Sequence, residues 1–266
     1  MQKIDFIKFL YIFKSAINPN KFFVMVNKVY RRLFDKYAPI NKKKYIDWLE
    51  FHSVLFEEWS TELSPSLAKE SLAFADNLYS RARKELSNNP YDMGGGGLVH
   101  IIYFITRFYK PKIIVETGIA SGYSSESILQ ANKLNCNNAK LFSSDFPYFR
   151  FPNPEKYIGQ LVSDEFKDNW SVFLKGDDKN LKNIVSEISH IDFFHYDSDK
   201  SYIGREKAFE NVKNYLSDNA VVMFDDINDN THFYDLVINN NFQDFVVISH
   251  KGSCVAGIVF LKKFKD

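Results

Sequence analysis

A short segment with two glycines carries residue types that could hold a nucleotide. The apolar run 113–115 leads into Glu116, and Gly118 and Gly122 follow. Such a run is typical of a buried parallel strand. Glycines after the strand allow a tight turn and close approach of a ligand to the backbone, and the free N–H groups of the next helix would point at that ligand. The segment predicts the first unit of a nucleotide-binding α/β domain.

The spacing of the glycines distinguishes this turn from two common phosphate-binding motifs. A dinucleotide fold would show G-x-G-x-x-G, and a phosphate loop would show G-x-x-x-x-G-K-[ST]. Here Ala120 stands in the middle glycine position, and no Lys-Ser/Thr pair follows. The remaining pattern, E-x-G-x-x-x-G, disfavours a nicotinamide dehydrogenase and leaves a plain strand-to-helix turn as an alternative. The four glycines at 94–97 also lack a Lys-Ser/Thr pair, so they form either a linker or a loop over a bound cofactor.

Acidic residues follow the later predicted strands, and ligands of parallel sheets bind at such strand ends. Asp145 follows the second strand, where a carboxylate could accept hydrogen bonds from both ribose hydroxyls. Residues 175–178 follow the third strand and could contact an adenine edge. The fourth strand ends in Asp197, and the fifth in Asp225 and Asp226. Any one of these aspartates could simply cap a helix, but acids at four successive strand ends indicate a binding site.

Strands and helices alternate around these residues. Strands are predicted at 113–116, 140–144, 171–174, 191–196, 220–224, 244–249 and 255–261. Helices are predicted at 98–109, 123–134, 155–168, 178–187, 203–216 and 230–239. The alternation predicts an α/β fold with a mainly parallel sheet, whose last two strands form a hairpin with one antiparallel edge strand.

The first ninety residues are predicted to be helical. One helix carries apolar residues from Tyr45 to Trp59, and another begins at Ser64-Pro65. We therefore expect an N-terminal helical region over 1–92 and the nucleotide-binding domain over 93–266.

With these motifs in place, residues 95–262 resemble the class I S-adenosylmethionine (SAM)-dependent methyltransferases, and within them the small-molecule and sugar O-methyltransferases. That group carries D-G-D-H-S-Y after one strand and D-D after a later one. Here these read Asp197-Ser198-Asp199-Lys200-Ser201-Tyr202 and Asp225-Asp226. The resemblance implies a seven-stranded Rossmann-like sheet. The residues expected to bind SAM are Glu116, Gly118, Gly122, Asp145, Asp177 and Asp178.

The fourth and fifth strand ends also resemble the metal site of catechol-type O-methyltransferases. Those enzymes hold their metal with an aspartate and an Asp-Asn pair, and they have a lysine three residues after the first ligand. The resemblance implies metal ligands at Asp197, Asp225 and Asp226, with Lys200 as general base and Asp197 also in the catalytic set. Mg²⁺ would relieve the repulsion between the carboxylates and lower the pKa of a bound hydroxyl. The usual histidine of the first motif is replaced by Lys200, which puts a histidine base in doubt.

These features predict an O-methyltransferase that methylates a hydroxyl of a sugar, a glycan precursor or another small molecule with the help of a divalent metal. One alternative is a metal-independent N-methyltransferase, in which Asp197 and Asp225 contact an amine. Another is a non-catalytic SAM-binding protein that docks on a partner through its basic N-terminal helices. Nucleic acid is a poor substrate, because the catalytic part of the chain is acidic and would repel phosphate.

Charge is distributed unevenly along the 266 residues. Residues 1–44 contain eleven Lys/Arg and two acids, a net charge of +9, so the remaining residues carry −8 within a total of +1. The basic, aromatic N-terminal helices either contact a membrane or another anionic surface, or pack on the rest of the chain or on a second subunit in a homodimer. Two cysteines give no disulfide framework. No secretory signal or membrane-spanning run is recognisable, so a cytoplasmic location is expected.

Overall fold

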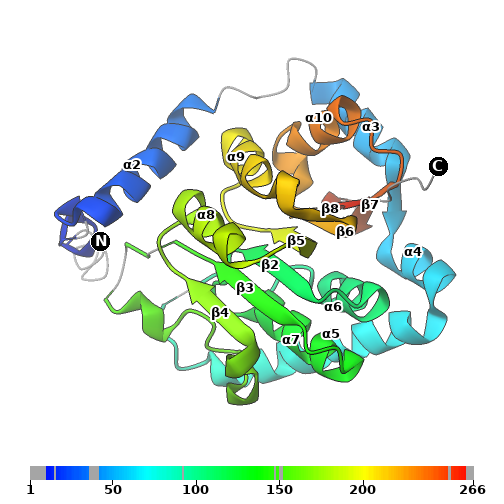
Figure 1. Cartoon of the computed structure of the whole chain (residues 1–266), viewed down its shortest axis with the longest axis horizontal. Helices are drawn as coiled ribbons and strands as arrows, with labels where there is room; N and C mark the ends of the chain where they lie inside the picture. The colour runs from blue at the N-terminus through cyan, green and yellow to red at the C-terminus, as the bar shows by residue number, and fades with distance from the viewer. Residues whose placement is uncertain are drawn as a thin grey trace.

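A computed structural model describes residues 10–14, 16–35, 42–91, 93–146, 148–149, 152–250 and 253–261. Its centre is an eight-stranded sheet in the order β1-β7-β8-β6-β5-β2-β3-β4. Figure 1 shows helices on both faces of this sheet. The arrangement confirms the predicted α/β, Rossmann-like fold with an antiparallel last strand.

All seven predicted strands are present: β2 (Ile113–Thr117), β3 (Lys140–Ser144), β4 (Trp170–Phe173), β5 (Ile191–Tyr196), β6 (Leu216–Asp225), β7 (Phe245–His250) and β8 (Ser253–Phe260). The prediction that the antiparallel strand lies at an edge is wrong. β8 pairs antiparallel with both β6 and β7, because a strand inserted between two others satisfies its backbone groups on both sides.

An additional strand, β1 (Ser53–Leu55), interrupts the helix predicted from Tyr45 to Trp59. The chain forms α3 (Lys42–His52), then β1, then α4 (Phe56–Leu63). β1 pairs in parallel with β7, with Val54 opposite Ile248. The N-terminal region thus contributes an edge strand to the sheet, and the domain boundary at 92/93 stays a prediction.

Two hydrophobic cores lie on opposite faces of the sheet, because successive side chains of a strand point to opposite sides. Phe193 contributes to one core and Phe194 to the other. The first core is covered by α4, α5 (Pro65–Glu85), α6 (Val99–Tyr109) and α7 (Tyr123–Asn135). The second is covered by α3, α8 (Asp177–Glu187), α9 (Tyr202–Val212) and α10 (His232–Asn239). As predicted, α5 begins with proline directly after Ser64.

The predicted helix over 155–168 is wrong. Only two short 3₁₀ turns form there, Pro154–Lys156 and Asp164–Asn169. Between them the backbone N–H of Gly159 donates to the carbonyl of Ala120 at 2.9 Å, and that of Leu161 donates to Ser121 at 2.9 Å. These bonds to the glycine turn compete with helical hydrogen bonds and hold the segment against the sheet edge.

Helix α2 (Pro19–Phe34) lies beside the carboxyl ends of the strands (Figure 1). Arg31 of this helix pairs with Asp178 at the start of α8 and with Asp199 after β5. The basic helix is therefore attached to the acidic strand ends. Within the described residues, no helix is long and apolar enough to cross a membrane.

Candidate functional site at the carboxyl ends of the strands

The glycine turn after β2 has the tight geometry expected from its sequence. Gly118 has φ +87°, and a Cβ placed there would lie 2.1 Å from the carbonyl oxygen of Asp197. Gly122 has φ +95° and stands directly before α7. Left-handed φ values strain other residues, and at Gly118 any side chain would also clash. The turn therefore packs directly against the backbone that follows β5, and this close contact requires glycine at position 118.

Glu116 lies beneath this turn and is fully buried. Its carboxylate accepts hydrogen bonds from the hydroxyl of Ser143 at 2.6 Å and from the hydroxyl of Ser125. Burial raises the pKa of Glu116, whereas the serine hydroxyls favour the charged form. Glu116 thus ties β2 to β3 and to α7, and its contact with SAM stays a prediction.

Asp145, which follows β3, connects that strand to the glycine turn. Its Oδ2 accepts hydrogen bonds from the backbone N–H groups of Ile119 (3.1 Å) and Ala120 (2.9 Å), and its Oδ1 accepts from Phe146 (2.7 Å). Only 1% of the residue is exposed, and burial raises the pKa of Asp145 to about 7 against the effect of these amides. Asp145 thus fixes the glycine turn to the end of β3, and its contact with a ribose stays a prediction.

Asp177 and Asp178 begin helix α8, and their carboxylates have different partners. Asp177 accepts hydrogen bonds from the hydroxyls of Ser144 (2.6 Å) and Ser198, and burial raises its pKa. Asp178 accepts from Arg31 Nη2 at 2.6 Å. Their contacts with SAM also stay predictions.

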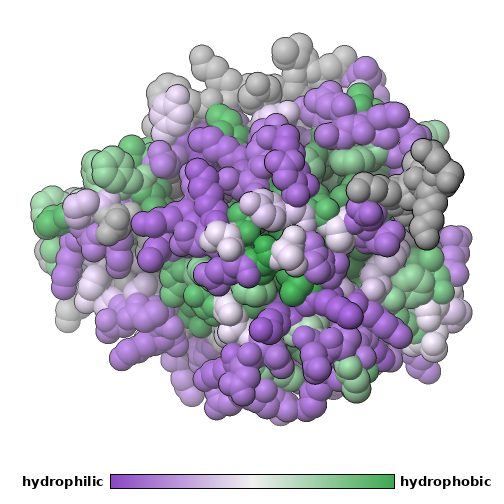
Figure 2. Space-filling model, viewed as in Figure 1, coloured by the Kyte–Doolittle hydropathy of each residue, from purple (hydrophilic) through white to green (hydrophobic). Residues whose placement is uncertain are grey.

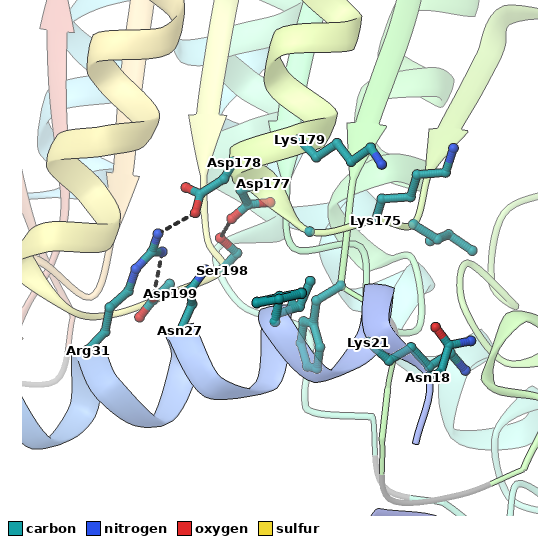
Figure 3. A pocket seen from close by; sticks show the side chains of 15 residues that line it. Asn18, Lys21, Asn27, Arg31, Lys175, Asp177, Asp178, Lys179, Ser198 and Asp199 are labelled. Atoms are coloured by element: carbon teal, nitrogen blue, oxygen red, sulfur yellow. Dashed lines mark hydrogen bonds and ion pairs between the residues drawn. The ribbon is translucent and has the colours of Figure 1, made fainter. Parts of the chain in front are cut away.

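A cavity of about 470 Å³ lies between α2 and this edge of the sheet. Figure 3 shows Lys21, Asn27 and Arg31 on α2, facing residues that follow β4 and β5. Phe146, which follows Asp145, also lines it. The cavity therefore adjoins the ends of β3 and β4, the two strand ends that are expected to bind the nucleoside part of SAM.

A second, much smaller cavity of about 30 Å³ lies at the glycine turn itself. Gly118, Asp197, Asp225 and Gly97 are among its lining residues. The hydroxyl of Tyr79 donates to the carbonyl of Gly97 at 2.7 Å. A Cβ at Gly97 would lie 3.1 Å from Asp225 Oδ2. The sequence left two interpretations of residues 94–97, a plain linker and a loop over a bound cofactor. The place of Gly97 beside the glycine turn agrees with the loop.

The three predicted metal ligands surround Lys200. Its ammonium nitrogen is hydrogen-bonded to Asp197 and lies 2.9 Å from Asp226 Oδ2. Burial alone would lower the pKa of Lys200, but the charges of Asp197, Asp225 and Asp226 outweigh it and raise the pKa. Burial, with the charge of Asp197, raises the pKa of Asp225 to about 8. The arrangement keeps Lys200 protonated.

The side chains as placed do not fit the predicted metal. Among the described residues, no group of three or more His, Cys, Asp or Glu is arranged to hold an ion. The ammonium of Lys200 occupies the position between Asp197 and Asp226 where a cation would have to bind. The three carboxylates thus lie close together, but the ammonium group of Lys200 balances their negative charge in place of a metal ion.

Two site residues were not predicted from the sequence. Arg31 closes one side of the larger cavity, and Ser198 bonds Asp177. The only sequence signal for Arg31 was the opposite charge of the N-terminal segment and the remaining chain. Ser198 stands where the family motif D-G-D-H-S-Y has glycine, so the resemblance implies no side-chain role at this position.

The part of the chain that carries this site matches a known family. The family described as "Methyltransferase domain" matches residues 115–227. This span includes the glycine turn, the strand ends of β3 to β6 and Lys200. No curated protein matches the sequence.

Solved structures of methyltransferases share the fold. A methyltransferase from Geobacter sulfurreducens is 12% identical with a TM-score of 0.51, covering 70% of this chain and 89% of its own. A putative caffeoyl-CoA O-methyltransferase from Staphylococcus aureus is 14% identical with a TM-score of 0.53, covering 84% and 99%. An O-methyltransferase from Bacillus cereus, solved in complex with SAH, is 14% identical with a TM-score of 0.52, covering 80% and 100%. At these identities the likeness shows the fold.

Proposed function

We propose that this chain is a SAM-dependent methyltransferase and that it methylates a hydroxyl oxygen of a sugar, a glycan precursor or another small molecule. The match to a methyltransferase domain and the fold support the proposal. One observation carries the proposal. Gly118 of the predicted SAM turn and two carboxylates of the Lys200 cluster, Asp197 and Asp225, line the same small cavity. A methyl donor at the turn would thus lie next to charged groups that can act on an acceptor.

The two cavities suggest how SAM lies across the strand ends. We place its adenosine part in the larger cavity, which is lined by residues 174–178 and by Phe146, the neighbour of Asp145 in the sequence. The methionine part would extend to the glycine turn and the smaller cavity. This placement uses Gly118 and Gly122 for close approach of the backbone and the carboxylate of Asp145 for the ribose hydroxyls.

When bound, SAM supplies an electrophilic methyl group on a sulfonium. The protein holds the acceptor oxygen in line with that methyl, and such orientation can supply about 7–11 kcal/mol of the barrier. As the new O–C bond forms and the C–S bond breaks, the hydroxyl proton passes to a carboxylate, for which we propose Asp197. The Lys200 ammonium stabilises negative charge on the oxygen. SAH and the methyl ether are the products.

Metal assistance stays a prediction, and no step of the proposed reaction depends on it. A divalent ion would have to displace the Lys200 ammonium from Asp197 and Asp226. Turnover measured before and after EDTA treatment tests the point. Loss of activity that Mg²⁺ restores would establish a metal requirement and would contradict the role of Lys200 proposed here.

The first experiment is calorimetric titration of SAM and of NAD into the purified protein. We expect saturable binding of SAM and none of NAD. Methyl transfer is then measured on hydroxylated acceptors and on matched amines, with product analysis. If only the amines are methylated, the chain is an N-methyltransferase and the proposal of O-methylation is wrong. If SAM binds but no acceptor is methylated, the result favours the non-catalytic SAM-binding protein.

The raised pKa of Asp145 makes SAM affinity pH-dependent. Only the ionised carboxylate accepts hydrogen bonds from both ribose hydroxyls. Because the pKa of Asp145 is about 7, the side chain must lose a proton before it can bind SAM in this way. Affinity is expected to fall as the pH drops through this value. Since one pKa unit corresponds to a tenfold change, Kd at pH ~5.5 should be at least about tenfold weaker than at pH ~8.

Calorimetry across this pH range makes the comparison, with Asp145→Asn as the matched variant. The amide keeps the size of the side chain but does not titrate, so its Kd should be weak at both pH values. Thermal melting of the variant verifies that it is folded. A wild-type Kd that does not change with pH would contradict the assigned contact.

A further inference from the structure

Helix α2 presents large apolar side chains to solvent. Phe22, Phe23, Val26 and Val29 are all exposed, Phe23 by 66% and Val29 by 52%. Their spacing of three and four residues places them in one stripe along the helix. Before the helix, Leu10, Phe13 and Ile17 are exposed as well. Figure 2 shows hydrophobic residues gathered at the left edge of the molecule, where Figure 1 places the start of α2.

The side of α2 opposite the stripe is bonded to residues that follow β5 and begin α8. These bonds keep the stripe facing solvent. Arg31 is only 8% exposed, and its two terminal nitrogens bond Asp178 at 2.6 Å and Asp199 at 3.0 Å. Just beyond the helix, Asp35 Oδ2 accepts from the backbone N–H of Tyr202 at 2.8 Å. A rotation of α2 that buried the stripe would break the Arg31 bonds.

The charge of the helix indicates what covers the stripe. The sequence of α2 contains no acid and four basic residues, Lys21, Lys28, Arg31 and Arg32, of which Arg31 is already paired with aspartates of the protein. Residues 1–44 together carry +9. Two copies of this chain packed through the stripe would bring these like charges together. A surface of anionic lipids would neutralise them and accept the apolar side chains at the boundary of head groups and acyl chains.

We propose that the exposed stripe of α2 docks the protein on an anionic membrane surface. The helix lies in the plane of the interface with the stripe inserted, and the net positive charge of residues 1–44 attracts the anionic head groups. The other side of the helix, with Lys21, Asn27 and Arg31, lines the larger cavity, and Phe23 at the border of the stripe lines it as well. The membrane would then lie on one side of the helix and the cavity on the other. Docking does not depend on the identity of the methyl acceptor.

The test is co-sedimentation of the full chain with vesicles of phosphatidylcholine, with and without phosphatidylglycerol. We expect binding to the anionic vesicles at least about tenfold tighter than to neutral ones, weakened by high salt. The double substitution Val26→Glu with Val29→Glu should reduce binding at least about tenfold, because charged groups do not insert. Both side chains are exposed and neither lines the larger cavity. The matched control is Phe51→Glu on α3, where the side chain is 84% exposed but lies outside the stripe. It should bind as the wild type does.

Three further measurements make the result decisive. Thermal melting and SAM titration verify that the double variant is folded, and unchanged SAM binding separates docking from the cofactor site. Light scattering gives the oligomeric state. The proposal is overturned by equal vesicle binding of wild type and double variant. It is also overturned by a wild-type dimer that fails to bind vesicles and that the double variant converts to a monomer, since a second copy then covers the stripe.

Discussion

Gly118→Ala is expected to abolish measurable SAM binding. The added Cβ would lie 2.1 Å from the carbonyl oxygen of Asp197, and the backbone at Gly118 has φ +87°. A backbone carbonyl cannot move aside as a flexible side chain can, so the turn or the segment after β5 must shift. Such a shift would separate the turn from Asp145, which bonds Ile119 and Ala120. We expect Kd to rise at least about 100-fold, a loss of about 2.7 kcal/mol.

A matched control separates the clash from simple backbone strain. Asn138 also has a left-handed backbone, φ +50°, but is exposed and lies in the connection between α7 and β3. Asn138→Ala should cost about 1–2 kcal/mol of stability and leave SAM affinity unchanged. Calorimetry gives Kd and thermal melting gives stability for both variants. If folded Gly118→Ala protein bound SAM as tightly as Asn138→Ala, SAM would not lie against this turn.

The strand–turn–helix unit was predictable from sequence because its signals are local. An apolar run, positive-φ glycines and a polar helix start all fall within residues 113–135, and β2 and α7 form there. The strand-end acids meet because parallel strands deliver their carboxyl ends to one edge. β1 was missed for the opposite reason. Three residues carry little intrinsic preference, and pairing with β7, far along the chain, makes them a strand.

The partners of charged side chains were the least predictable part of the site. Arg31 contacts Asp178 and Asp199 across 147 and 168 residues of sequence, and no local pattern specifies such pairs. Lys200 lies three residues after Asp197, the spacing of enzymes with a catalytic lysine, and this spacing led to its prediction as a general base. Spacing does not specify protonation, however. The three carboxylates raise the pKa of Lys200, and this favours a positive charge over a base.

Lys200→Met is therefore expected to lower kcat at least about 100-fold, the typical cost of removing one group that stabilises charge in the transition state. The larger cavity, where we place adenosine, is lined by other residues, so Kd for SAM should change only a few-fold. Kinetics on an acceptor found by screening and calorimetry with SAM give the two quantities separately.

Lys200→Arg distinguishes the two roles of this residue. Arginine keeps the positive charge and can bond Asp197 and Asp226, but it stays protonated at any working pH. If Lys200 acts as a cation, the arginine variant should retain clearly more activity than the methionine variant. If Lys200 is the general base, both variants should be equally inactive, since neither can accept a proton. Activity measured with EDTA on the wild type completes the argument: a base prepared by a nearby dication requires the metal, whereas the ammonium held by Asp197 and Asp226 does not.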